Sequence, residues 1–264
     1  MLSPAQQHLR RMQAQLDAQE RTGQEPMNGS AYAQQMSVFH HDYLRLKQIQ
    51  SIEAKAALKQ QLIPQYIPYL EGVLKADSGA ADAIVTNIFS WSIDAGLYDT
   101  AFWLGEYVLR HHLAMPDRFE RTAACFLAEE IAEAAERCRR AGTLFASIDI
   151  LLRTEDLTQA HDMPDQVRAK LHMVIARQGL VHAGDSPTPQ VLSQAIGRFH
   201  RALALDAKCG CKKELESAER QLRQMSQVME APPKPDDEQR TTPNTPLHEG
   251  NPSVPATRRP RSGG

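Results

Sequence analysis

The stretch from Asp162 to Asp206 constrains the fold of this chain more than any other. Apolar residues recur at helical spacing over 164–182 and again over 191–205, and the turn-forming letters GDSP at 184–187 separate the two segments. Because glycine and proline interrupt helices, we expect two helices that fold back on each other as a hairpin. Such a hairpin is a building unit of an all-α protein.

The rest of the chain repeats this helical pattern. Ala, Leu, Gln, Arg and Glu are abundant and are good helix formers, whereas runs of Val, Ile, Thr and aromatic residues at period two are scarce. Apolar residues make up 42% of the chain, which is enough for a core, although only 6% is aromatic. We therefore predict an all-α fold, an irregular array of helical hairpins, with further helices over 4–20, 31–46, 51–62, 80–95, 99–112, 117–141, 146–160 (one weak helix or two short ones) and 212–229.

Two features mark the N-terminal helices. Ser3 is a suitable N-cap for the first helix, and Pro4 suits its first position. This helix has a single thin apolar stripe, too narrow to support a core alone, formed by Leu2, Leu9, Met12 and Leu16. Further on, Pro64 and Pro68 cannot both lie inside an undistorted helix, so we expect a kink or short turns at this point.

Charge and composition divide the chain into four parts. Residues 1–75 form an N-terminal helical region with 8 basic and 6 acidic residues, and residues 76–160 form a central acidic domain with 7 basic and 14 acidic residues. Residues 161–230, with 10 basic and 8 acidic residues, form a C-terminal helical hairpin. Residues 231–264 are rich in Pro, Thr and Gly, and we expect this tail to be disordered.

Several classes of protein are excluded or disfavoured. No run approaches 18 apolar residues and the polar N-terminus lacks a signal core, so we expect a cytoplasmic protein without membrane contact. The chain has neither a phosphate-binding GxxxxGK[ST] motif nor a dinucleotide-binding GxGxxG motif, and no His-Asn-His nuclease signature. We expect no cofactor, and we interpret the four cysteines as free thiols.

Two segments resemble the second helix of a tetratricopeptide repeat. One places Ala101 after a Gly-x-Tyr turn, and the other has Ala195, Phe199 and Ala202 at repeat-like offsets. The alanines Ala101 and Ala195 are 94 residues apart, which is not a multiple of the 34-residue period. This spacing favours a partly repeat-like array of hairpins, and any antiparallel helical hairpin would give a similar pattern.

Four glutamates on the predicted helix 117–141 invite a metal-binding interpretation, as in two-metal hydrolysis of phosphodiesters. These residues are Glu129, Glu130, Glu133 and Glu136. The opposite side of the helix has the apolar stripe, and arginines follow, so a solvated helix face with Glu129, Glu133 and Glu136 toward water is the stronger interpretation. The apolar stripe is expected to consist of Phe119, Leu127, Ile131, Ala134 and Cys138.

A second possible metal site is Cys209-Gly210-Cys211 with His200. Structural zinc generally uses two ligand pairs, with two to four residues between the cysteines of a pair, whereas only one residue lies between Cys209 and Cys211, so this cluster falls short of that pattern. The histidine pairs at 40–41 and 111–112 have no local Asp, Cys or Ser partner in a motif. We therefore predict no metal site.

The best candidates for nucleic-acid contact are six cations in the N-terminal region. Lys55 and Lys59 are expected to share an exposed helix face at i, i+4. Exposed flexible cations are sufficient to bind phosphates, although the same residues also serve as ordinary solubilising charge. The six candidates are Arg10, Arg11, Arg45, Lys47, Lys55 and Lys59.

The segment DMPDQVRAKLHMV at 162–174 resembles the small, or endonuclease, subunit of the terminase of temperate contractile-tailed phages. Further elements of that family occur in the same order: SPAQ at 3–6, a Lys-rich helix before LIPQYIPYLEGVL at 62–74, Trp91 before Asp94-Ala95-Gly96, Met115-Pro116, and KKE at 212–214. The resemblance covers about residues 1–225. In the tail the chain departs from the strongly basic pattern of the family, because only Arg258, Arg259 and Arg261 cluster there.

The resemblance implies a role in packaging viral DNA. A small subunit of this kind recognises the double-stranded packaging site, assembles as a homo-oligomer, and recruits or regulates a large subunit that contains the ATPase motor. Cutting at cohesive ends is attributed to the pair, so the resemblance leaves open whether this chain is itself an enzyme. Two alternatives are a protein-interaction adaptor without DNA contact and a nuclease that cuts alone.

Overall fold

The computed structural model describes residues 2–21, 30–116 and 120–230. Over these residues the protein has eleven α-helices, a short 3₁₀ helix (η1) and no strand, so the all-α prediction is confirmed. Phe119 and the tail 231–264 lie outside the described residues. The elements are α1 (Pro4–Glu20), α2 (Ala31–Lys47), α3 (Ile52–Leu62), η1 (Ile63–Gln65), α4 (Ile67–Ala76), α5 (Ala83–Asp94), α6 (Tyr98–Arg110), α7 (Ala123–Arg140), α8 (Ile148–Thr158), α9 (Asp165–Ala183), α10 (Pro189–Leu205) and α11 (Lys212–Glu230).

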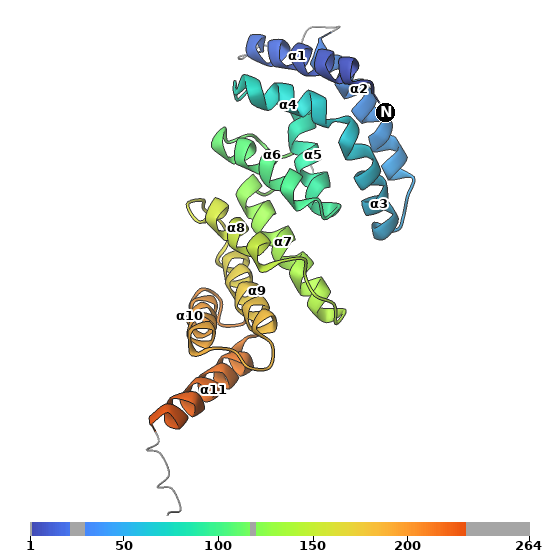
Figure 1. Cartoon of the computed structure of the whole chain (residues 1–264). Helices are drawn as coiled ribbons and strands as arrows, with labels where there is room; N and C mark the ends of the chain where they lie inside the picture. The colour runs from blue at the N-terminus through green and yellow to red at the C-terminus, as the bar shows by residue number, and fades with distance from the viewer. Residues whose placement is uncertain (1, 22–29, 117–119, 231–264) are drawn as a thin grey trace, which may run out of the picture.

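The helices follow one another along an elongated array, from α1 at one end to α11 at the other (Figure 1). Most packing joins helices that are close in sequence, such as α5 with α6, α9 with α10, and α10 with α11. The main exception is α1, which lies against α4. The two ends of the array are therefore built from different parts of the chain, and each can present its own surface.

Short polar side chains fix where several helices begin. Ser3 forms a capping box with Gln6: the Ser3 hydroxyl accepts from the Gln6 amide, and the Ser3 amide donates to the Gln6 side chain at 2.8 Å. Thr122 caps α7 in a similar way, so α7 begins at Ala123. The expectation of a helix already at 120–122 is wrong, because the cap residue must have non-helical backbone angles.

The prolines produce the predicted break. The helix α3 ends at Leu62, Pro64 lies in η1, and Pro68 lies in the first turn of α4, where its missing N–H leaves no bond unmade. The weaker stretch 146–160 forms the single helix α8, capped by Ser147. Within the described part, no helix is both long and apolar enough to cross a membrane.

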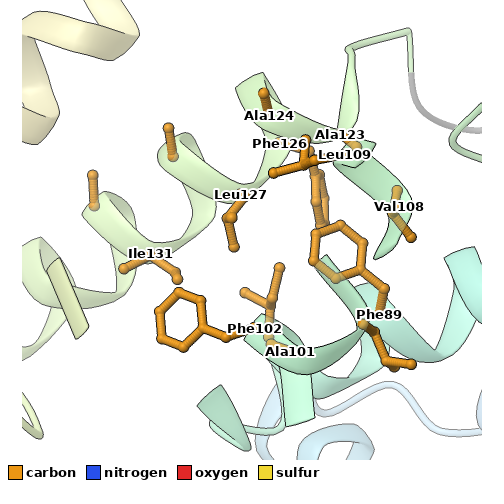
Figure 2. Packing of buried hydrophobic residues seen from close by; sticks show 14 of the residues in the cluster. Phe89, Ala101, Phe102, Val108, Leu109, Ala123, Ala124, Phe126, Leu127 and Ile131 are labelled. Carbon is orange, nitrogen blue, oxygen red and sulfur yellow. The ribbon is translucent and has the colours of Figure 1, made fainter. Parts of the chain in front are cut away.

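The central core lies between α5, α6 and α7 (Figure 2). Phe89 packs edge-to-face against Phe126 with ring centroids 6.1 Å apart, and Phe102, Leu127 and Ile131 are buried beside them. Burial of each such side chain contributes about 1.5–3 kcal/mol relative to its exposure to water. This aromatic centre holds α5, α6 and α7 together in the middle of the array.

Small residues hold α1 against α4. Ala14 and Ala18 are fully buried, and a Cβ atom placed on Gly72 of α4 would lie 2.2 Å from the carbonyl oxygen of Arg11. The two backbones therefore approach too closely for any side chain at position 72. The predicted apolar stripe of α1 does not make this contact, since its large members are among the exposed apolar residues: Leu9 (56% exposed), Met12 (38%) and Leu16 (56%).

Cations bind the acidic face of α7. Glu136 is only 5% exposed and accepts a bond of 2.7 Å from Arg177 of α9, which also donates to Glu214 of α11 at 2.7 Å. Glu133 accepts from Lys170 of α9 at 3.0 Å. The expectation that Glu136 faces water is wrong, because α9 packs over this side of α7 and brings Arg177 to the carboxylate.

The predicted hairpin over 162–206 is formed by α9 and α10, which pack closely across the turn at 184–188. The small and apolar residues at the repeat-like offsets, Ala195, Phe199 and Ala202, are all buried against this interface or the adjoining α11. The hairpin itself is confirmed, and the tetratricopeptide geometry stays a prediction.

Candidate nucleic-acid interface

Two buried aspartates fix the N-terminal helices on which the candidate cations lie. The first is Asp42 of α2, which is 3% exposed. Its carboxylate accepts from the Tyr66 hydroxyl at 2.8 Å, from the Gln65 amide at 2.5 Å and from Arg45 at 2.9 Å. Burial together with this carboxylate raises the pKa of Tyr66 far above its ordinary value, so Tyr66 remains a donor at all ordinary pH values.

The second buried aspartate is Asp82, which caps α5 by accepting from the amides of Ile84 and Val85 at 2.9 and 3.1 Å. Its other oxygen accepts from the Tyr69 hydroxyl at 2.6 Å and from Arg21 at 2.9 Å. The side chain of Asp82 is fully buried and that of Arg21 is 7% exposed. This pair connects the C-terminal end of α1 to the start of α5.

Three of the six candidate cations are bound within the protein. Arg11 pairs with Glu71 of α4 at 2.9 Å, and Arg45 pairs with Asp42 within α2. Lys59 forms a short ion pair with Asp94 of α5, and its side chain is only 13% exposed. The expectation that Lys59 shares an exposed face with Lys55 is therefore wrong, because α5 packs against α3 at this point.

The other three candidates have no ion-pair partner within the described residues. Arg10 on α1 and Lys55 on α3 are partly exposed, and Lys47 at the end of α2 is exposed with its ammonium 4.9 Å from the Tyr43 ring centroid. Burial raises the pKa of Tyr66, and the charges of Arg10 and Arg45 act in the opposite direction. Three helices thus each contribute one cation that is at least partly exposed and has no ion pair in the described part of the chain.

The glutamates of α7 are the first set of candidate metal ligands. Glu129 pairs with Arg121, and burial raises the pKa of the half-buried Glu130. In the ranges that the structure describes, no group of three or more His, Cys, Asp or Glu residues is positioned to hold a metal ion. The carboxylates of α7 instead form ion pairs that tie helices together.

The thiols of Cys209 and Cys211 are 3.4 Å apart, while His200 pairs with Glu219 of α11 at 3.2 Å. Burial and the neighbouring thiol raise the pKa of Cys211 to about 12, so this thiol stays protonated at neutral pH. Cys211 is buried and Cys209 is partly exposed where α10 leads into α11.

Comparison with known proteins identifies the class. A sequence profile described as "Phage small terminase subunit" matches residues 36–166. Over 225 residues the chain is 38% identical to the "Terminase, endonuclease subunit" of Escherichia phage P2, with 84% of this chain and 87% of that protein covered. The chain belongs to the phage small terminase subunit family. No solved structure matches it significantly.

Sequence patterns did not reveal Arg21 and Asp82, the buried pair that positions α1 on α5. Arg21 lies at the end of a predicted helix and Asp82 at the start of another, so local signals indicate only ordinary helix ends. A groove between α8 and α10 was missed for the same reason, since it exists only when three helices are assembled.

Proposed function

We propose that this protein binds the viral packaging site, as double-stranded DNA, through its N-terminal helices, and that it recruits the large motor subunit of the terminase. Membership of the small terminase family supports the general role. The observation that favours the N-terminal helices is that three adjacent helices each have a cation with no ion pair among the described residues, namely Arg10, Lys47 and Lys55. Backbone contacts of this kind give affinity, whereas base contacts would give the sequence preference.

The test is a triple charge reversal, Arg10→Glu, Lys47→Glu and Lys55→Glu. Each phosphate contact that is lost reduces the slope of log affinity against log salt by about 0.9, so the triple variant is expected to lose about 2.7 of that slope. A matched control reverses three exposed cations of α11, Lys213, Arg220 and Arg223. Equal DNA affinity and salt slope in the wild type and the N-terminal variant would contradict the assignment.

We further propose that α1 supports self-association. Four residues of α1 follow the d–a–d–a spacing of a coiled coil on the side opposite to its contact with α4, namely Ala5, Leu9, Met12 and Leu16. The positions flanking this seam are largely uncharged, namely Gln6, Gln13, Gln15 and His8, so two copies would meet without strong repulsion.

Light scattering of the double variant Leu9→Glu, Leu16→Glu tests this seam. The variant is expected to be smaller than the wild type at equal concentration. Ile52→Glu is the control, since Ile52 is an exposed apolar residue (86%) outside the seam. An unchanged mass for the double variant would rule out this seam as the interface.

Hydrolysis of DNA is assigned to the large subunit in this proposal. The related phage P2 protein is named an endonuclease subunit, and the described residues of this chain offer no clustered metal ligands. Purified protein incubated alone with cohesive-end DNA and Mg²⁺ or Mn²⁺ is expected to leave the DNA intact. Specific cutting in the absence of the large subunit would instead make this chain the nuclease.

A further inference from the structure

The helices α8, α9 and α10 enclose a groove with a cavity of about 600 Å³. Its floor is apolar and largely buried, formed by Ile175 and Ala176 of α9 and Ala195 of α10. A second cavity of about 420 Å³ adjoins it and shares Ile148 and His182 with the first. The two cavities therefore lie next to each other along α9.

Two helix glycines line the first cavity, Gly179 in α9 and Gly197 in α10. A Cβ atom at Gly197 would meet nothing within 4 Å, and one at Gly179 would make only an ordinary contact of 3.6 Å with Ile148. Neither glycine has a left-handed backbone, and glycine inside a helix is less favourable than alanine. The packing of this chain therefore gives no reason for either glycine, whereas a partner backbone lying close to α9 and α10 would.

The unmatched charge at the rim of the groove is positive. Glu155 of α8 already binds Arg198 at 2.7 Å and His172 at 3.1 Å. Arg201 is exposed and has no ion pair among the described residues, and His182 lies exposed between the two cavities. Among the described residues no carboxylate lines the first cavity, and Asp149, which lines the second cavity next to the shared Ile148, accepts from the Ser147 hydroxyl.

Exposed apolar side chains also line the second cavity. Leu144 is 76% exposed and Val181 is 51% exposed, and both line the second cavity. Large apolar residues gathered beside a preformed groove are typical of a protein-binding surface. An apolar floor, room for a backbone and a basic rim match a segment that has both apolar and acidic side chains.

We propose that this groove binds an apolar, acidic segment of the large terminase subunit. The apolar side chains of that segment lie on the floor, its backbone crosses Gly179 and Gly197, and a carboxylate pairs with Arg201. This assignment rests on the proposed recruitment of the large subunit and adds the surface and chemistry through which it occurs.

The experiment measures the affinity of the full-length protein for the purified large subunit. Gly197→Leu fills the groove from a position with open space around it and is expected to weaken the complex at least tenfold while the melting temperature is maintained or raised. Arg201→Glu is expected to weaken it at least fivefold. Arg220→Glu, an exposed cation of α11 outside the groove, is the control and leaves the affinity unchanged.

The outcomes separate the two proposals. If the wild type binds the large subunit and both groove variants bind equally well, the groove assignment is overturned and recruitment stands. If the wild type does not bind the large subunit at all, recruitment fails and the groove assignment fails with it. If the groove variants lose self-association but retain the large subunit, the occupant is a second copy of this chain, which also overturns the assignment.

Discussion

The two ends of the array differ in the space around their helix glycines and in the burial of their paired carboxylates. At the N-terminal end, Gly72 is required because the backbone of α1 occupies the space where a side chain would lie. At the other end, Gly197 borders open space that nothing in the described chain fills. The paired carboxylates differ in the same way, since Asp82 is fully buried whereas Glu155 forms its ion pairs at the edge of a groove.

The α1–α4 region therefore makes its contacts within the protein, whereas the α8–α10 region leaves part of its apolar surface uncovered. Close backbone packing joins α1 to α4, and a buried ion pair joins the end of α1 to the start of α5, so these helices have a single arrangement. The α8–α10 region keeps an apolar groove open instead. Variants that strengthen or remove single contacts at each end test whether the contrast is real.

The largest effect is expected from Asp82→Ala. The substitution removes the closer of the two carboxylates that pair with the buried Arg21, leaves only Asp17, and removes the cap of α5, so the free energy of unfolding is expected to fall by about 3–5 kcal/mol. The control is Glu71→Ala, which breaks a pair whose side chains are both 40% exposed and is expected to cost no more than about 1 kcal/mol. Urea denaturation measures both values, and equal losses would refute the special role of the buried pair.

The next largest change in stability is expected from substitutions of the two helix glycines Gly72 and Gly197. Gly72→Ala forces α1 away from α4 and is expected to lower the free energy of unfolding by about 1–3 kcal/mol. Gly197→Ala adds a better helix former in open space and is expected to raise it by up to about 1 kcal/mol. Thermal unfolding under identical conditions compares the two variants, and shifts of the same sign would remove the contrast between the two regions.

An acid titration tests the ion pairs at the groove. Hydrogen bonding from His172 and the pairing with Arg198 lower the pKa of Glu155 to about 2, against an unfolded value near 4.3. Because the folded pKa is the lower one, this stabilisation is present above about pH 4.3 and is lost as the pH falls toward 2. The Glu155→Gln variant is expected to be less stable than the wild type by about 1–3 kcal/mol at pH 6.

Denaturation of both proteins at pH 6, 4 and 3 measures the loss. The gap between wild type and Glu155→Gln is expected to narrow as the solution becomes more acidic, although both become less stable as other paired carboxylates such as Glu136 are protonated. A gap that stays constant from pH 6 to pH 3 would show that Glu155 does not supply it.

The smallest effect separates two neighbouring lysines of α3. Lys59→Ala breaks the pair with Asp94 of α5 and is expected to lower the free energy of unfolding by at most about 1 kcal/mol. Lys55→Ala is expected to leave stability unchanged and to weaken DNA binding, because Lys55 has no ion pair among the described residues. A larger loss of DNA affinity for Lys59→Ala than for Lys55→Ala would reverse this assignment.

Helix positions were predictable from the sequence because their signals are local. The Ser3 capping box, the break at Pro64 and the hairpin over 162–206 all depend on residues within a few positions of one another. Family membership was also predictable from the sequence, because motifs that occur in a fixed order can be recognised without knowledge of the fold.

The sequence by itself determined the all-α fold, most helix boundaries and the family, because periodicity, caps and motifs are written along the chain. Only the tertiary structure decided which side chains remain available. Lys59 and Glu136 look exposed on their own helices, and a neighbouring helix binds each of them. Burial and pairing depend on residues distant in sequence, so a helix wheel places the alanine face and the leucine stripe of α1 correctly but cannot say which one meets α4.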